Sequence, residues 1–336
     1  MNKNSGQSSQ DTGDSSHSLS LFYSDLGDHY KSKGKLSEAL ECYIKRMEIV
    51  KDLSQRSPDN ADLSRDLIFC YEGIADVLKT IGLRDNAMQY YIKGLLILTE
   101  LDKRFPDTFK FHYDLSMCYC LLGELCISIG DEEKALPYYE KVIEINKELS
   151  QQFPENIKYR DNLAAGYCKL GDLSQKLRKD DIAMECHQKA LEIRKALSQS
   201  FPHRNGLLES YLKLGTLSES MGDLPQAIEY ELKAMEIVRD LNVQSPEKVH
   251  FSNALSICYN GLGDFYKKMS NNTQAVEYFQ KALEIENDLT QRFPDNADYS
   301  RSLALTCRRL GDLAILNDNT NAQYFQQEVG INEDLI

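Results

Sequence analysis

The chain has 336 residues and a formal net charge of −13, with 42% hydrophobic and 27% charged residues. These proportions are typical of a folded globular protein, and no run of about 18 apolar residues is present that could span a membrane. The excess of negative charge disfavours nucleic acid as the main ligand, because that affinity comes from Lys and Arg side chains. We therefore expect partners that are proteins or peptides of basic or neutral character.

The first 18 residues, MNKNSGQSSQDTGDSSHS, are polar and lack the apolar core of a secretory signal. Their composition predicts a disordered polar tail. The nine cysteines are an odd number, and most of them recur at equivalent positions of a repeat. This placement predicts small buried side chains in a reducing cytoplasm rather than a disulfide framework.

A repeat of 48 residues occupies the rest of the chain. The marker Leu170, Gly171 and Asp172 recurs, strictly or loosely, around Leu26, Ile74, Leu122, Leu214, Leu262 and Leu310. A fixed period of this length indicates a solenoid in which stacked repeats share one continuous core. We expect a single solenoid domain over residues 19–335, with units at about 19–58, 59–106, 107–154, 155–202, 203–246, 247–294 and 295–336.

Each repeat carries two helical patterns, called here helix A and helix B. In the second repeat Leu63, Leu67 and Ile74 belong to an apolar stripe with spacings of three and four, which predicts an amphipathic helix A. Gly82 predicts a left-handed stop after helix A, and Pro106 ends helix B because proline cannot continue the hydrogen-bond ladder. The equivalent residues are Gly34, Gly130 and Gly222, and Pro58, Pro154, Pro202, Pro246 and Pro294. The residues Asp59, Asn60 and Asn296 are expected to cap the helices that follow.

Three residue types at fixed positions relate the repeat to a known family. An aromatic residue precedes the marker leucine by three positions, at Tyr23, Tyr71, Tyr119, Tyr167, Tyr211 and Tyr259. An alanine opens helix B at Ala39, Ala87, Ala135, Ala183, Ala227 and Ala275, and an aromatic residue follows it at Tyr43, Tyr91, Tyr139 and Phe279. With a small residue after the marker leucine, this pattern resembles the tetratricopeptide repeat (TPR), a helix-turn-helix unit of about 34 residues. The resemblance implies an all-α fold, a right-handed superhelical solenoid of about seven antiparallel helix pairs.

The repeat departs from that family pattern in three ways. Apolar positions continue past the usual helix ends, so the longer period predicts roughly two extra turns in each helix. In the fifth repeat Leu214 follows Pro202 by only 12 positions, which predicts a shorter helix A and a local gap or bend. The terminal units are predicted to be caps, with a short first helix A that starts near Ser18 and a polar last helix B. An alternative for Leu335 and Ile336 is contact with a second copy, so that a homo-oligomer forms through terminal units.

One face of helix A is the expected binding surface, because the resemblance implies that this face lines a concave groove. One position on this face, called here the ladder, is occupied by Asp28, Asp76, Glu124, Asp172, Thr216, Asp264 and Asp312, six of which are acidic. We expect an acidic groove that binds a basic or neutral peptide. The candidate groove residues are Asp28, Phe69, Glu72, Asp76, Met117, Cys120, Glu124, Cys168, Asp172, Asn260, Asp264, Lys267, Arg308 and Asp312. The alternative is that the ladder is structural and bonded locally by Lys79, Lys176 and Lys268.

Residue patterns of catalysis are missing from the sequence. None of the six histidines lies four residues from another to form a helical metal pair, and His187 occupies an aromatic position of helix B. Some relatives grip a chaperone carboxylate with Lys and Asn four residues apart, but Glu72 and Asp76 would repel such a tail. We expect no cofactor, no metal and no enzymatic activity, and a scaffold for protein binding as the function. Two alternatives stay open: a regulatory receptor whose solenoid changes shape around a peptide, and an enzyme hidden in the groove.

Overall fold

A computed structural model describes residues 5–200, 204–245 and 247–316, which contain thirteen α-helices and no strand. The prediction of an all-α fold is confirmed. The chain divides into two compact units, residues 1–177 and 178–336. The single solenoid over residues 19–335 stays a prediction. The last helix B, with Leu335 and Ile336, lies outside the described residues.

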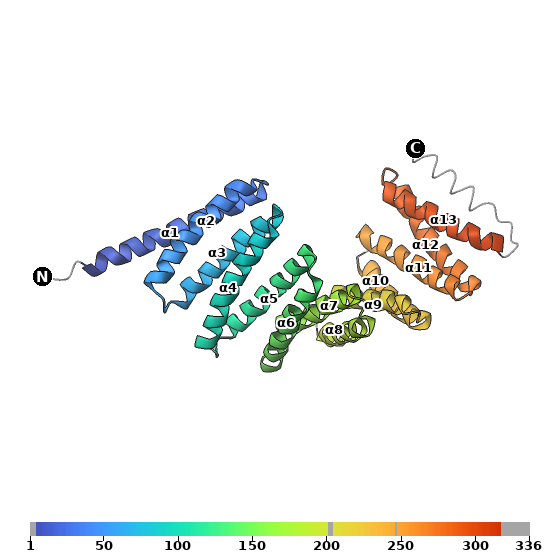
Figure 1. Ribbon diagram of the computed structural model, residues 1–336. Coiled ribbons are helices and arrows are strands. Elements are labelled where there is room, and N and C mark those ends of the chain that lie inside the picture. Colours follow the sequence, from blue (N-terminus) through green and yellow to red (C-terminus); the bar gives the residue numbers. More distant parts are fainter. Residues whose placement is uncertain (1–4, 201–203, 246, 317–336) are drawn as a thin grey trace. The chain divides into compact units, whose positions relative to one another are not determined.

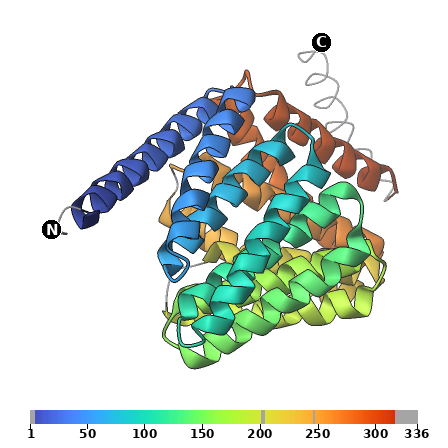
Figure 2. The same ribbon diagram turned by 60° about the vertical axis from the view of Figure 1, so that its left-hand side comes forward.

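Both units are stacks of helix pairs, in which odd-numbered helices are helix A and even-numbered helices are helix B. Unit 1 contains α1 (Ser5–Ser32), α2 (Leu36–Arg56), α3 (Ala61–Thr80), α4 (Arg84–Arg104), α5 (Phe109–Ile129), α6 (Glu132–Gln152) and α7 (Ile157–Lys176). Unit 2 contains α8 (Asp180–Ser200), α9 (Arg204–Ser220), α10 (Leu224–Gln244), α11 (Val249–Lys268), α12 (Asn272–Arg292) and α13 (Ala297–Leu316). Within each unit every helix packs alongside the next one in the chain (Figure 1, Figure 2).

Most helix ends lie where the sequence predicts them, but Asp59 bonds to Arg104 at 2.8 Å instead of capping α3. Arg56, Arg104, Gln152 and Arg292 each end a helix B two residues before a proline, since the residue before proline is driven out of the helical region. Asn60 Oδ1 accepts hydrogen bonds from the amides of Asp62 (3.0 Å) and Leu63 (3.2 Å), and Asn296 caps α13 in the same way. The predicted extension is also confirmed: each described helix B has 21 residues.

The turn between helix A and helix B uses a left-handed residue. Gly34, Gly82, Gly130 and Gly222 have φ between 72° and 93°, as predicted. In the fourth and sixth repeats the same place is taken by Arg178 (φ 59°) and Ser270 (φ 60°). A side chain in this region is strained, because Cβ approaches the carbonyl oxygen that follows. Two turns of the chain therefore carry a local conformational cost that glycine would remove.

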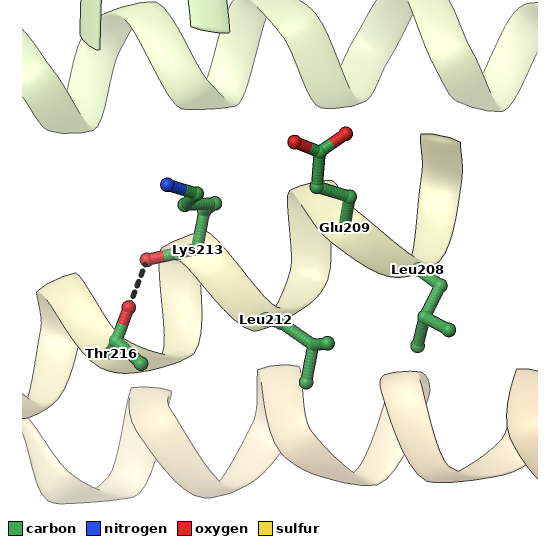
Figure 3. A pocket seen from close by; sticks show the side chains of 5 residues that line it. All are labelled: Leu208, Glu209, Leu212, Lys213 and Thr216. Atoms are coloured by element: carbon green, nitrogen blue, oxygen red, sulfur yellow. Dashed lines mark hydrogen bonds between the residues drawn. The ribbon is translucent and has the colours of Figure 1, made fainter. Parts of the chain in front are cut away.

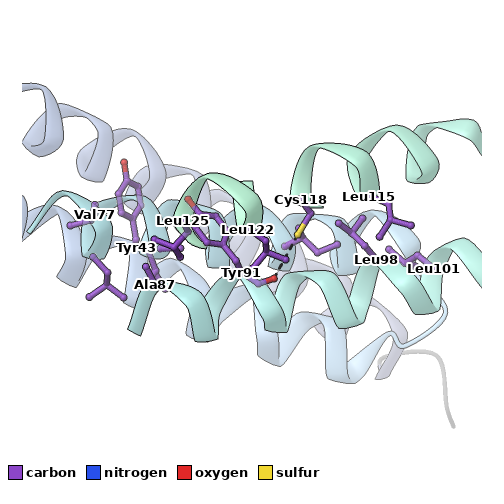
Figure 4. Close-up of a cluster of buried hydrophobic side chains, with 14 of the residues drawn as sticks. Tyr43, Val77, Ala87, Tyr91, Leu98, Leu101, Leu115, Cys118, Leu122 and Leu125 are labelled. Atoms are coloured by element: carbon purple, nitrogen blue, oxygen red, sulfur yellow. Dashed lines mark hydrogen bonds between the residues drawn. The ribbon is translucent and has the colours of Figure 1, made fainter. Parts of the chain in front are cut away.

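The helix B aromatic residues fill the space that glycine leaves on helix A. A Cβ placed on Gly27 would lie 2.7 Å from Tyr43, and one on Gly263 would lie 2.5 Å from Phe279. Both rings are almost fully buried. Around Tyr91, side chains of α3, α4 and α5 form a continuous core (Figure 4). These close approaches confirm that the marker glycine and the aromatic residue serve packing.

The fifth repeat has the short helix A that the deletion predicts. Helix α9 has 17 residues, whereas α3, α5, α7, α11 and α13 have 20 or 21. The buried Arg194 of α8 reaches the start of α9, where Nη1 donates hydrogen bonds to the Gly206 carbonyl oxygen and the Ser210 hydroxyl, both at 2.8 Å. Its Nη2 lies 3.1 Å from Glu209. A charged anchor therefore holds the first turns of α9, in the repeat where the sequence lacks the usual first-turn aromatic.

The predicted start of the first helix is wrong. We expected helix A of the first repeat to begin near Ser18, but α1 begins at Ser5 and has 28 residues. The segment before Ser18 has no apolar stripe, so periodicity could not reveal it. Once the packed part of α1 is formed, each added residue gains a hydrogen bond without a new nucleation cost, which lets the helix extend through polar sequence.

Candidate functional site: the helix A face

In unit 1 the ladder carboxylates are bonded within the protein. Asp76 accepts hydrogen bonds from Lys31 Nζ and the Tyr91 hydroxyl, both at 3.0 Å, and Lys169 Nζ donates to Glu124 at 2.6 Å. The Tyr43 hydroxyl donates to Asp28 at 2.5 Å. Burial raises the pKa of Asp76, but Lys31 and Tyr91 outweigh burial and hold the pKa below its ordinary value. Each of these carboxylates therefore ties its helix to another one.

Unit 2 shows the same arrangement with different partners. Arg309 Nη2 of α13 donates to Asp264 of α11 at 2.8 Å, and its guanidinium lies 5.7 Å from the centre of the Phe279 ring. Lys267 Nζ lies 3.9 Å from Asp312. Thr216 of α9, the one ladder residue that is not acidic, donates a hydrogen bond to the carbonyl oxygen of Lys213 at 2.9 Å. The ladder thus bridges neighbouring helices A in this unit too.

The cations that bridge the ladder differ from those that the structural alternative names. Lys176 pairs with Glu132 at 2.6 Å, and Lys268 pairs with Glu219. The residues that bond the ladder instead come from a neighbouring repeat, 45 residues away in each case: Lys31, Lys169, Lys267 and Arg309. These cations offset much of the negative charge on this face, so the helix A face is less acidic than a count of carboxylates suggests.

A second set of helix A residues forms an exposed row that the sequence analysis recognised only in part. Seven positions before the ladder, a large apolar side chain is exposed in five repeats: Leu21 (48% exposed), Phe69 (38%), Met117 (40%), Ile257 (60%) and Leu305 (44%). We call these five residues the apolar row. Ala165 and Glu209 take the position in the fourth and fifth repeats. The signal that was missed is the repeat period itself, because Leu21, Ile257 and Leu305 occupy the same position of their repeats as Phe69 and Met117 do.

Glu72 differs from the other candidate carboxylates of unit 1. It lies on α3 between Phe69 and Asp76, is half-buried, and takes part in no hydrogen bond or ion pair within the described residues. Burial, with Asp114 and Asp76 nearby, raises the pKa of Glu72 to about 7. This carboxyl is the part of the predicted acidic groove that has no internal partner.

Two predicted groove residues lie in the core instead. Asn260 is buried, donates a hydrogen bond to Glu286 Oε1 at 2.9 Å, and accepts one from Thr306 at 3.0 Å. Cys168 is 7% exposed. Cys120 is partly buried on α5, while Arg308 and Asp172 are exposed. The position of a residue on one helix face, as derived from periodicity, does not tell whether its side chain is buried between helices or exposed at the surface.

The structure also places a cavity on the fifth repeat, where the sequence predicts a gap. A cavity of about 480 Å³ is lined by Leu208, Glu209, Leu212, Lys213 and Thr216 of α9. Leu208 and Leu212 project from one side of the helix, and Glu209 and Lys213 from the other (Figure 3). Of these residues only Thr216 was predicted to lie on the binding face. The deletion in this repeat predicts the length of helix A but not which of its side chains line a cavity.

The described ranges contain neither a candidate metal site nor a candidate membrane span. No group of three or more His, Cys, Asp or Glu side chains in the described part of the chain could hold a metal ion. None of the helices in residues 5–200, 204–245 and 247–316 combines the length and apolar character needed to cross a bilayer. Burial raises the pKa of the Cys118 thiol to about 12 and that of Cys70 to about 11, so these thiols are poor nucleophiles.

Comparison with known proteins identifies the same repeat that the sequence pattern indicates. Models of the tetratricopeptide repeat match residues 23–57, 118–149, 164–197 and 257–289. The structure of BtubC (BKLC) from P. vanneervenii is similar, with 23% identity over 76% of this chain and 92% of that chain and a TM-score of 0.55. The apo form of RapI has 17% identity over 94% of this chain and 98% of that chain, with a TM-score of 0.52. At these identities the likeness shows the fold alone, and no curated protein matches the sequence.

Stacked helix pairs with an exposed helix A face define a repeat protein of the class that serves protein–protein interaction. The chain contains tetratricopeptide repeats at the four matched segments, and in this sequence the repeat marker recurs with a period of mostly 48 residues.

Proposed function

We propose that the chain is a scaffold that binds an extended segment of a partner protein along the helix A face, without chemistry of its own. The observation that carries this proposal is the apolar row, because five repeats expose a large apolar side chain at one equivalent position. Scattered exposed apolar residues are ordinary on a protein surface, but exposure at one equivalent position of successive stacked repeats, as in the three repeats of unit 1, is typical of an interaction site. Covering one half-exposed side chain of this size contributes about 1 kcal/mol.

The spacing of the row supports an extended partner. The ion pairs from Lys31 to Asp76 and from Lys169 to Glu124 show that helices A of adjacent repeats are direct neighbours. Packed helices lie about 8–10 Å apart, and an extended chain rises about 3.3 Å per residue. A bound segment would therefore place an apolar side chain against each repeat at about every third residue.

The experiment removes the row from unit 1. A peptide is selected on the full-length protein from a displayed library of random twelve-residue sequences, and its affinity is measured by isothermal titration calorimetry. We expect the triple variant Leu21→Ser, Phe69→Ser, Met117→Ser to bind this peptide about 100-fold more weakly, since three contacts of about 1 kcal/mol are lost. The control Ile92→Ser, Leu96→Ser removes exposed apolar residues from helix B and should bind normally.

Equal affinity of the triple variant and the wild type would refute binding along the row of unit 1. The scaffold and the receptor hypotheses differ in a second measurement, small-angle X-ray scattering with and without the selected peptide. A scaffold keeps its radius of gyration, whereas a receptor that closes around its ligand becomes more compact.

A further inference from the structure

Glu72 takes part in no hydrogen bond or ion pair within the described residues, in contrast to the ladder carboxylates Asp76 and Glu124. Asp76 has Lys31 and Tyr91, and Glu124 has Lys169. The neighbouring Asp114 accepts hydrogen bonds from Arg65 Nε at 2.5 Å and Nη2 at 3.2 Å. An unpaired, half-buried carboxylate is unfavourable in the free protein, so a partner that supplies a cation would relieve this cost on binding.

The surroundings of Glu72 leave its charge unbalanced. The charged or titratable groups that act on it or bond its neighbours are Arg65 and Asp76 of α3, Asp114 and Cys118 of α5, Tyr91 of α4 and Lys31 of α1. Both cations in this set are engaged with other carboxylates, and the Arg65 guanidinium also lies 4.8 Å from the centre of the Phe69 ring. Burial, Asp114 and Asp76 raise the pKa of Glu72 by more than the Arg65 guanidinium lowers it, and neither cation forms an ion pair with Glu72.

The position of Glu72 is acidic only in the second repeat. The equivalent residues in the seven repeats are Ser24, Glu72, Cys120, Cys168, Leu212, Asn260 and Arg308. The apolar row, by contrast, presents similar surfaces in successive repeats, so a partner with regularly spaced apolar residues could shift by one repeat at little cost. A single carboxylate at one repeat would favour the one position of the partner that places a cation beside it, so the shifted positions would bind more weakly.

We propose that the partner segment carries a Lys or Arg side chain that pairs with Glu72, between apolar side chains that cover Phe69 and Met117, and that this pair sets the register of the segment on unit 1. This inference rests on the proposed function. It commits to a peptide of mixed character, apolar at about every third residue with one basic residue among them. Charge complementarity at Glu72, the exposed ring of Phe69 one turn before it, and the exposed thioether of Met117 in the next repeat are the grounds for this choice.

Pairing with a cation requires an ionised Glu72, which makes binding depend on pH. Because burial raises the pKa of Glu72 to about 7, the carboxyl is mostly protonated at pH 6 and mostly ionised at pH 8. The affinity for a basic peptide should therefore rise about tenfold between pH 6 and pH 8, and binding at pH 7 should release about half a proton. Titration calorimetry in two buffers of different ionisation enthalpy measures this release.

The test uses the same twelve-residue library on the full-length wild type, on Glu72→Gln and on a control. Glu140→Gln is the matched control, because Glu140 is an exposed glutamate of α6 away from the helix A face. We expect peptides selected on the wild type and on Glu140→Gln to share a basic residue next to apolar ones. Peptides selected on Glu72→Gln should keep the apolar residues and lose the enrichment in Lys and Arg.

A double-mutant cycle then measures the interaction between Glu72 and the basic residue of the peptide separately from other effects of each substitution. Replacing the basic residue of a selected peptide by Gln should weaken binding to the wild type about tenfold and leave binding to Glu72→Gln unchanged. Equal affinity of wild type and Glu72→Gln for the basic peptide, with the same pH profile, would overturn the inference. Apolar peptides without a basic residue would overturn it while the proposed function stands. Failure to select any peptide would count against both.

Discussion

Glu231 offers a sharp test of how unit 2 is stabilised. It lies on α10 four residues after Ala227, the position at which Tyr43, Tyr91 and Phe279 fill the space between helices in other repeats. The side chain is 9% exposed, lies beside Gly215 and Gly261, and accepts a hydrogen bond from the Cys258 thiol. Burial raises the pKa of Glu231 to about 7 from an ordinary value of 4.5.

This shift predicts how stability depends on pH. The folded state holds the proton more tightly than the unfolded state, so the contribution is favourable below pH 4.5 and is lost as the pH rises to about 7. A shift of about 2.5 pH units corresponds to about 3 kcal/mol in the free energy of unfolding, of which about 2.5 kcal/mol is lost between pH 5 and pH 8. Glu231→Gln keeps the shape of the side chain and removes its titration.

The assay is urea denaturation of the full-length protein at pH 5 and pH 8, with hydrogen exchange of α10 peptides to assign the change to unit 2. We expect the stability of Glu231→Gln relative to the wild type to rise by about 2.5 kcal/mol between pH 5 and pH 8, from nearly equal stability at pH 5. Glu236→Gln, an exposed glutamate of the same helix, is the control and should follow the wild type. A constant difference between Glu231→Gln and wild type at both pH values would refute the argument.

Three other substitutions test individual contacts, each by urea denaturation of the full chain. Ser270→Gly should raise the free energy of unfolding by about 1 kcal/mol, because it relieves a left-handed residue at φ 60°; an unchanged midpoint would contradict this. Tyr91→Phe should lower the free energy of unfolding by about 1 kcal/mol, because the hydroxyl that donates to Asp76 is lost. Asp76→Asn should lower the free energy of unfolding less in the Tyr91→Phe protein than in the wild type, since the two residues share this hydrogen bond. Arg194→Met should lower it by about 2 kcal/mol and speed hydrogen exchange in α9, whereas normal protection of α9 would show that the bonds to Gly206 and Ser210 do not hold this helix.

Helix boundaries could be predicted from the sequence because they depend on local chemistry. Pro106 removes a backbone donor, Gly82 permits a positive φ, and Asn60 offers a side-chain acceptor to the next amides. Each of these effects acts within one turn of the chain, so the sequence contains all the relevant information. The start of α1 at Ser5 was missed for the opposite reason, because the polar segment extends a helix that packing elsewhere has already formed.

The partners of the ladder could not be predicted, because they depend on how two helices stack. Lys31 and Lys267 lie three residues after a ladder position, whereas Lys169 and Arg309 lie three residues before one. Which of these offsets faces a carboxylate on the neighbouring helix depends on the tilt and rise between repeats. Helical periodicity describes a single helix and contains neither quantity. For the same reason it could not show that Asn260 is buried while Glu72 forms no hydrogen bond or ion pair with the residues that the structure describes.

The repeats differ in the residue at the aromatic position of helix B, and comparing them shows which group donates a hydrogen bond to each ladder carboxylate. Where the aromatic position of helix B is Tyr43 or Tyr91, its hydroxyl donates to the ladder carboxylate of the same repeat. The sixth repeat has Phe279, which has no hydroxyl, and there Asp264 takes Arg309 as its donor.

In the fifth repeat the carboxyl is on helix B at Glu231, and the ladder residue is Thr216, so two carboxyl groups do not meet in the core. The donor thus changes from repeat to repeat while the ladder keeps an acidic acceptor, except in the fifth repeat, where Glu231 brings a carboxyl group from helix B. Glu72 differs from the ladder residues, since no described residue of unit 1 donates a hydrogen bond to it. A binding experiment that reverses charge at Glu124 would also break its bond with Lys169, whereas Glu72→Gln changes the surface and leaves the internal pairs intact.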